Sequence, residues 1–150
     1  MTKNYEFLKV EGSNLYRIKA LRDIRIETPT ATVIINEGTL GGCVEMKESL
    51  PQDSNSWIYE NGVVRGKPTI KDTVLVAGEI KGKATVIGSY IEGKGVSIQD
   101  NAIVRNSTIY GNAIIYQQAV VRNCTLGTDD INNSNIIKIG EDTKNLTIMY

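Results

Sequence analysis

The chain has 150 residues, in which 17 lysines and arginines balance 17 aspartates and glutamates. This length is enough for one domain, and the balanced charge creates no overall field that would draw the protein to nucleic acid or to a membrane. The sequence contains no histidine. Metal sites built from histidine ligands are therefore excluded, and the side chain that most often acts as a general base near neutral pH is missing.

The first 50 residues carry short strand patterns without a regular period. Residues 5–10 and 15–26 are predicted as two strands joined by a turn, and residues 33–35 as a further strand. A loop is expected from 47 to 56. We predict that residues 1–50 form a β cap on the segment that follows, because an open strand edge invites aggregation. In an alternative interpretation, this cap includes an irregular first coil.

From Trp57 onward the sequence repeats itself. The segment NAIVRNSTI at 101–109 returns 17 residues later as QAVVRNCTL at 118–126, and KATVIGSYI at 83–91 keeps the same frame 18 residues earlier. A period near 18, built from units of six, is typical of a β-solenoid whose coil has three short sides. The aliphatic residues that mark these units are Ile58, Val64, Ile70, Val76, Ile80, Val86, Ile91, Ile98, Val104, Ile109, Ile115, Val121 and Leu126.

These observations predict an all-β fold, a three-sided parallel β-helix over residues 51–127. Aliphatic side chains would fill the narrow interior, and backbone hydrogen bonds would join coils about 4.8 Å apart. A β-sandwich is the alternative, but a sandwich does not require a nine-residue echo at one coil length. Long apolar stretches at helical spacing are missing, and β-branched residues dominate.

Residues 128–150 follow the repeats and end in an alternating pattern at 146–150 that is typical of a strand. We predict that this tail either caps the last coil or pairs with a neighbouring subunit. The two cysteines, Cys43 and Cys124, lie far apart, and Cys124 takes the place of a serine in the other copies. Cys124 is therefore predicted to be a small core residue rather than a disulfide partner or a nucleophile.

Residues 15–23, 38–45 and 57–62, together with the hexapeptide repeats, resemble the YdcK-like family of bacterial and phage proteins. The resemblance covers roughly residues 5–127. It implies a left-handed parallel β-helix, a homotrimer with grooves between its subunits and, because members are often labelled transferases, an acyl- or nucleotidyl-transferase activity. Position 43 is usually aromatic in that pattern and is a cysteine here.

The missing histidine argues against catalysis. Hexapeptide-repeat acyltransferases usually use a histidine as the general base, and the related carbonic anhydrases need three histidine ligands. The chain also lacks a P-loop, a nucleophile elbow and a Cys/His pair. A carboxylate base remains the alternative, although acidic turn residues are usually only solvated; the candidates are Glu92, Asp100, Asp129 and Asp130. We expect a protein without catalytic activity, cofactor or bound metal.

Two arginines occupy equivalent places on consecutive copies of the repeat. Two guanidinium groups so placed repel each other unless they splay apart or hold an anion between them. Two asparagines would stack beside them, and two tyrosines on the following sides would offer rings to a base. The alternative is an amide ladder beside exposed arginines without a ligand. The predicted ligand-binding residues are Arg105, Arg122, Asn106, Asn123, Tyr110 and Tyr116.

We therefore expect a β-helix that binds or sequesters a small phosphorylated or nucleotide-like ligand in grooves between subunits, with no nucleic-acid or membrane partner. In a phage such a protein would serve anti-defence, holding a host nucleotide signal in the host cytoplasm. A cytoplasmic location is expected because neither a secretion signal nor an 18-residue apolar run is present. The alternatives are a structural or protein-binding solenoid, whose tail drives assembly, and a transferase with a carboxylate base.

Overall fold

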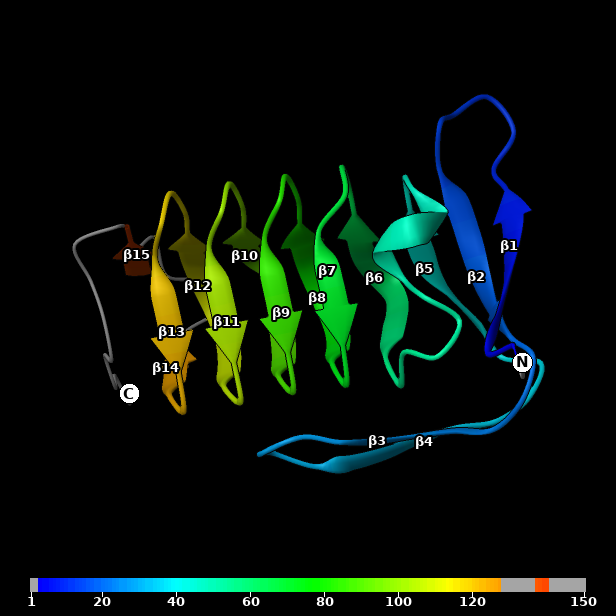
Figure 1. Cartoon of the computed structure of the whole chain (residues 1–150), viewed down its shortest axis with the longest axis horizontal. Helices are drawn as coiled ribbons and strands as arrows, with labels where there is room; N and C mark the ends of the chain where they lie inside the picture. The colour runs from blue at the N-terminus through cyan, green and yellow to red at the C-terminus, as the bar shows by residue number, and fades with distance from the viewer. Residues whose placement is uncertain (1–2, 128–136, 141–150) are drawn as a thin grey trace.

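The computed structural model describes residues 3–127 and 137–140 of the chain. Its strands form stacked parallel coils, and the β-solenoid predicted from the repeats is confirmed (Figure 1). Within the described residues the only helical segment is the short 3-10 helix η1 (Lys47–Ser49). This part of the chain therefore holds no helix with the length and apolar character to cross a membrane.

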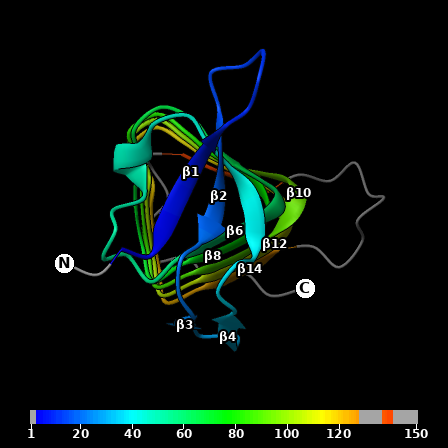
Figure 2. The ribbon, with the colours of Figure 1, turned by 90° about the vertical axis from the view of Figure 1, so that its right-hand side faces the viewer.

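Each coil has three sides, and the coils superpose when the stack is viewed along its axis (Figure 2). Long strands run through the first two sides, with register shifts between their halves: β6 (Trp57–Val64), β8 (Val74–Ile80), β10 (Tyr90–Ile98) and β12 (Thr108–Ile115). Short strands form the third side: β7 (Thr69–Lys71), β9 (Thr85–Ile87), β11 (Ile103–Arg105) and β13 (Val120–Arg122). On the first and second sides the fifth coil adds β14 (Thr125–Gly127) and β15 (Ile137–Ile139).

The coil length follows from the parallel pairing of the strands. The residues aligned at the start of the first side are Trp57, Val74, Tyr90, Thr108 and Thr125, so that successive coils take 17, 16, 18 and 17 residues. On the third side Ile103 pairs with both Thr85 and Val120, which is the register that the sequence echo predicts. The left-handed sense of the helix, which the resemblance implies, stays a prediction.

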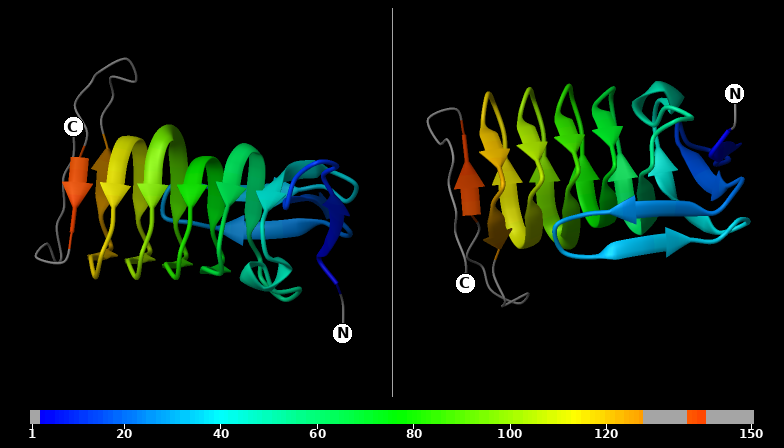
Figure 3. Two further views of the ribbon diagram at one scale, coloured as in Figure 1. Left: turned by 90° about the horizontal axis from the view of Figure 1, so that it is seen from above. Right: turned by 60° about the horizontal axis from the view of Figure 1, so that its bottom comes forward.

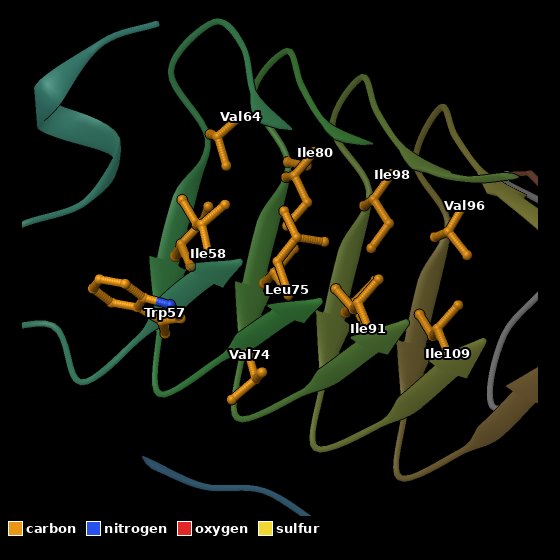
Figure 4. Packing of buried hydrophobic residues seen from close by; sticks show 14 of the residues in the cluster. Trp57, Ile58, Val64, Val74, Leu75, Ile80, Ile91, Val96, Ile98 and Ile109 are labelled. Carbon is orange, nitrogen blue, oxygen red and sulfur yellow. The ribbon is translucent and has the colours of Figure 1, made fainter. Parts of the chain in front are cut away.

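Each side of a coil contributes a buried aliphatic side chain to the interior. The columns are Ile58, Leu75, Ile91, Ile109 and Leu126 on the first side, Val64, Ile80, Ile98, Ile115 and Ile139 on the second, and Ile70, Val86, Val104 and Val121 on the third. Figure 4 labels four members of the first column and three of the second: Ile58, Leu75, Ile91, Ile109, Val64, Ile80 and Ile98. Each such burial contributes about 1.5–3 kcal/mol. The prediction was wrong at Val76, which is half-buried, because Leu75 one residue earlier fills the interior and strand alternation turns Val76 outward.

A second interior column is polar and lines the corner between the third and first sides. It consists of Ser56, Thr73, Ser89, Ser107 and Cys124, all buried. From Thr73 on, each side chain donates to the carbonyl two residues earlier, at 2.7 Å for Thr73, 3.1 Å for Ser89, 2.8 Å for Ser107 and 2.9 Å for the Cys124 thiol. Each hydroxyl also accepts the N–H of the equivalent residue one coil further on. The prediction that Cys124 is a small core residue is confirmed.

Two corners of the coil need a residue with positive φ. The corner after the third side uses Asp72, Gly88, Asn106 and Asn123, with φ of 49°, 63°, 49° and 53°. The corner after the second side uses Gly66, Gly82, Asp100 and Gln117, with φ of 72°, 74°, 61° and 57°. Glycine, asparagine and aspartate tolerate this left-handed conformation better than other residues, which explains most of these choices.

The N-terminal strands close one end of the stack. β1 (Tyr5–Lys9) pairs antiparallel with β2 (Tyr16–Ala20), which pairs antiparallel with β5 (Leu40–Val44). β5 then pairs parallel with β6 and begins the coil stack. This close approach requires glycine, because a Cβ at Gly41 or Gly42 would lie 2.4 or 2.3 Å from a carbonyl oxygen of β6.

A hairpin leaves the cap and runs along the solenoid (Figures 1 and 3). It consists of β3 (Ile24–Glu27) and β4 (Thr32–Ile35), paired with each other alone. Ile24, Ile26 and Ile35 are buried in the same core cluster as the solenoid residues. At the tip the Thr30 and Thr108 hydroxyls are hydrogen-bonded, so that the hairpin reaches the fourth coil. The prediction of one strand over 15–26 was wrong: the segment forms β2 and β3, which belong to different sheets.

Candidate functional site

The two predicted arginines lie side by side on the third side of the solenoid. Arg105 on β11 pairs in register with Arg122 on β13, and both side chains are exposed. The same column begins with Lys71 and Ile87, aligned with them on β7 and β9. None of the four ion pairs in the described residues involves Lys71, Arg105 or Arg122. We call these three residues the cationic column.

The two predicted asparagines lie one residue further along, at the corner. Asn106 follows Arg105 and Asn123 follows Arg122, and both have positive φ. Their backbone N–H groups donate to the preceding coil, Asn106 to the Ile87 carbonyl at 2.9 Å and Asn123 to the Arg105 carbonyl at 3.0 Å. The residue type is thus explained in part by the turn, while the exposed amides stay available to a ligand.

The two predicted tyrosines do not join this group. Tyr110 ends the first side of the fourth coil and is packed over Gly127, where a Cβ would meet the tyrosine ring at 2.6 Å. Tyr116 follows the second side and donates its backbone N–H to the Ile139 carbonyl at 2.9 Å. The structure therefore places the tyrosines on the sides of the coil that the sequence predicts, away from the corner that carries the asparagines.

A cleft of about 830 Å³ lies between the β3–β4 hairpin and the corner that carries the two asparagines. This volume is in the range of small-molecule sites. The lining residues are Arg25, Glu27, Thr28 and Pro29 from the hairpin, Asn55, and Asp72, Ile87, Gly88, Asn106, Asn123, Cys124 and Thr125 from the solenoid. The hairpin wall could not be predicted from the sequence, because residues 25–29 lie about 60 to 100 positions before most of the corner residues that they face.

Charge is distributed unevenly around this cleft. Arg25 and Glu27 neutralise each other, with Nη2 of the arginine 3.2 Å from Oε1 of the glutamate. Asp72 lies at the corner of the first coil, next to Lys71. Arg105 and Arg122 belong to the third and fourth coils; neither lines the cleft, but the residues that follow them, Asn106 and Asn123, do. Within the described part of the chain, the positive charges without an ion-pair partner therefore lie next to the end of the cleft that is furthest from the cap.

The two candidate carboxylate bases that the structure describes, Asp100 and Glu92, do not line the cleft. Asp100 sits at the other positive-φ corner, where its carboxylate accepts the Gln117 backbone N–H at 2.9 Å. Glu92 is exposed on the first side, near Tyr90, whose pKa is raised by burial and then by the charge of Glu92. Asp129 and Asp130 lie outside the described residues. Among the residues that the structure describes, no group of three cysteines, aspartates or glutamates could hold a metal ion.

Comparisons with known proteins do not assign the chain to a group. No family model, no curated protein and no solved structure matches it. The resemblance to the YdcK-like family therefore stays a prediction, and a functional conclusion has to come from the cleft and from the residues around it.

Proposed function

We propose that the protein is a non-catalytic binding solenoid, which holds a small phosphorylated or otherwise anionic ligand in the cleft under the β3–β4 hairpin. The observation that carries this proposal is the cationic column. Lys71, Arg105 and Arg122 have no ion-pair partner among the described residues. None of the three lines the cleft, which is large enough for a small molecule, but each directly precedes a residue that does: Asp72, Asn106 and Asn123. A bound anion would provide the negative charge that these three cations do not find among the described residues.

The electrostatics favour an anion at the arginine end. Aligned residues on neighbouring parallel strands are about 4.8 Å apart, and two unit charges at that separation repel by about 1 kcal/mol in water. A phosphate or carboxylate beside both guanidinium groups removes this repulsion and accepts charge-assisted hydrogen bonds worth about 1.5–3 kcal/mol each. The wall formed by the hairpin shields the ligand on its other side, so that one chain is sufficient to build the site.

Binding without turnover fits the chemistry of the lining. The cleft offers one cysteine, whose buried thiol donates to the Arg122 carbonyl, and the carboxylates Glu27 and Asp72. Glu27 is held in its ion pair with Arg25. No lining side chain is paired with a general base in the way that nucleophilic catalysis requires. Sequestration of a ligand, including the nucleotide signal expected for a phage protein, needs no such pair.

Isothermal titration of the purified protein with inorganic pyrophosphate tests this proposal. The double variant Arg105→Ala/Arg122→Ala should bind at least about tenfold more weakly than the unchanged protein, because each charge-assisted hydrogen bond lost costs about 1.5 kcal/mol or more. The matched control is Lys67→Ala/Lys83→Ala, which removes two exposed cations from equivalent positions at another corner. If both double variants lose affinity equally, or if no pyrophosphate binds, the proposal is wrong.

A structural or protein-binding solenoid is the second candidate, and the regular stack itself favours it. Ile34 on the hairpin has 60% of its surface exposed, and Leu40, the first residue of β5, has 45%. Exposed apolar residues are available for contact with another macromolecule. This candidate predicts that the cationic column has no effect on any small ligand, which the same titration measures.

A further inference from the structure

The lining of the cleft is rich in groups that recognise hydroxyls. It contains the amides of Asn55, Asn106 and Asn123 and the hydroxyl of Thr125, whereas the Thr28 hydroxyl is already hydrogen-bonded to the Ala31 backbone. Amides donate and accept hydrogen bonds in one plane, and threonine hydroxyls do both by rotation. A ligand that carries several hydroxyl groups can therefore be matched at many points, whereas an apolar ligand would leave these groups unpaired at a cost.

The lining offers no platform for a flat base. Among the described residues that form it, none is aromatic. The tyrosines predicted to stack on a base, Tyr110 and Tyr116, belong to the ends of the first and second sides instead. Since stacking on an aromatic ring supplies much of the affinity for a nucleobase, a nucleotide would gain little here beyond what its sugar and phosphate provide.

The order of charges along the cleft gives the ligand a direction. Asp72, Gly88, Asn106 and Asn123 follow one another at the corner of successive coils, so that Asp72 and Asn123 are about 14 Å apart at 4.8 Å per coil. A carboxylate at the first position accepts hydrogen bonds from hydroxyls and repels phosphate. Arg105 and Arg122 at the other end attract phosphate. Hydroxyls should therefore point toward the cap, and the anionic group toward the arginines.

From these three observations we infer that the cleft takes a monosaccharide phosphate, with its phosphate beside Arg105 and Arg122, some of its sugar hydroxyls on the corner amides and the others directed toward Asp72. This inference rests on the proposed function and narrows its ligand class. The hairpin wall and the corner amides select the sugar, and the cationic column supplies affinity for phosphate of any origin.

Titration calorimetry with five probes tests the ligand class: glucose 6-phosphate, N-acetylglucosamine 1-phosphate, ribose 5-phosphate, AMP and inorganic phosphate. At least one of the sugar phosphates should bind about tenfold tighter than inorganic phosphate, a difference that calorimetry resolves. AMP should bind no tighter than ribose 5-phosphate, since its base finds no ring to stack on. Tighter binding of AMP, or equal binding of all five probes, would overturn the sugar assignment while leaving the anion site in place.

Two variants separate selection of the sugar from binding of the phosphate. Asn123→Gly keeps a residue suited to positive φ, as Gly88 shows at the same corner, and removes one amide. Asp72→Asn removes the carboxylate charge. Each should weaken the best sugar phosphate about fivefold and leave inorganic phosphate no weaker. Their controls are Gln117→Gly and Asp100→Asn, at positive-φ positions of the other corner. Equal effects of a variant and its control on sugar-phosphate binding contradict the inference. If Arg105→Ala/Arg122→Ala is the only variant that loses binding of every probe, the result supports the proposed function.

Discussion

At the scale of single residues, the buried hydroxyls explain how a narrow corner is kept free of unpaired polar groups. The turn before each first side carries a backbone N–H that faces the interior. The side chain of the equivalent residue in the preceding coil accepts it, as the Ser107 hydroxyl does for the Cys124 N–H at 3.2 Å. A small residue is required there because the interior at the corner leaves no room for more. Serine, threonine and cysteine all meet this condition.

Replacement of Ser107 by alanine should therefore lower the free energy of unfolding by about 1–3 kcal/mol, because it removes the hydroxyl that accepts the N–H of the buried Cys124. Ser107→Cys should cost less, since Cys124 already occupies an equivalent position. Urea unfolding measures both changes. Ser97→Ala, on the half-buried outer surface of β10, is the control and should be nearly neutral. A Ser107→Ala variant as stable as the control would show that the hydroxyl column contributes nothing.

The buried Tyr5 hydroxyl also accepts a backbone N–H, and its contribution to the free energy of unfolding depends on pH. This hydroxyl lies 2.6 Å from the Ser54 and Ser56 carbonyl oxygens and accepts the Ser56 N–H, and burial raises its pKa to about 12. Since the unfolded value is 10.0, the folded protein holds this proton more tightly, and the linked stability is complete below pH 10 and lost between pH 10 and 12. A difference of two units between the folded and unfolded pKa corresponds to a contribution of about 3 kcal/mol at most to the free energy of unfolding.

Tyr5→Phe tests this linkage. At neutral pH the variant should be less stable by about 1–3 kcal/mol, because the Ser56 N–H loses its acceptor. The difference between the two proteins should shrink as the pH rises from 10 to 12, since only the unchanged protein carries the titrating hydroxyl. Chemical unfolding at several pH values gives this difference directly. A constant difference across that range would mean that the Tyr5 pKa is close to its value in the unfolded chain.

At the scale of elements, the β3–β4 hairpin is the part that converts a regular stack into a site. One of its faces is buried through Ile24, Ile26 and Ile35, while Ile34 on the other face is 60% exposed. Ile26→Ser should release the hairpin from the solenoid and increase amide hydrogen exchange in β3 and β4, while exchange in β8, β10 and β12 stays slow. Ile34→Ser is the matched control and should leave exchange unchanged. Faster exchange in both variants would show that burial of Ile26 does not hold the hairpin in place.

The sequence predicted the elements best where residues repeat. The echo at 101–109 and 118–126 set the register of the third side, because equivalent residues in successive coils must align for the interior to fill. The prediction failed where one position could be read in two ways: Val76 and Leu75 are neighbours of similar size, and only the packed coil decides which points inward. It also failed to separate β2 from β3, because the turn between them carries no glycine or proline.

At the scale of the whole molecule, stability should be nearly a sum over neighbouring coils. Deletion of residues 90–107 removes one full coil and joins Ser89 to Thr108, so that every remaining strand meets an equivalent partner. This variant should stay folded and unfold cooperatively at a lower urea concentration. Deletion of residues 90–98 removes two sides of the coil and should abolish cooperative unfolding. Circular dichroism during urea titration distinguishes the two, and similar behaviour of both deletions would contradict the additive picture.

The candidate site shows which of its features can be predicted from sequence patterns and which cannot. The pairing of Arg105 with Arg122 was predictable, since both lie in one repeat frame, and so were the equivalent positions of Asn106 and Asn123 beside them. The cleft was not predictable, because its second wall comes from a hairpin outside the repeats whose own residues do not encode where it docks. For the same reason Asp72 and Asn55 carry no distinguishing signal before the chain is folded.

The contact between Thr30 at the hairpin tip and Thr108 relates the length of the hairpin to the number of coils between the cap and Thr108. The hairpin has a fixed reach set by β3 and β4, whereas the stack grows by one strand spacing, about 4.8 Å, with each coil. Coils added beyond Thr108 would lengthen the protein without changing the segment between the cap and Thr108. A coil inserted before it would carry Thr108 out of reach of the tip. Growth of this protein, by evolution or by design, therefore keeps the tip contact when coils are added at one end of the stack and changes it when they are added at the other.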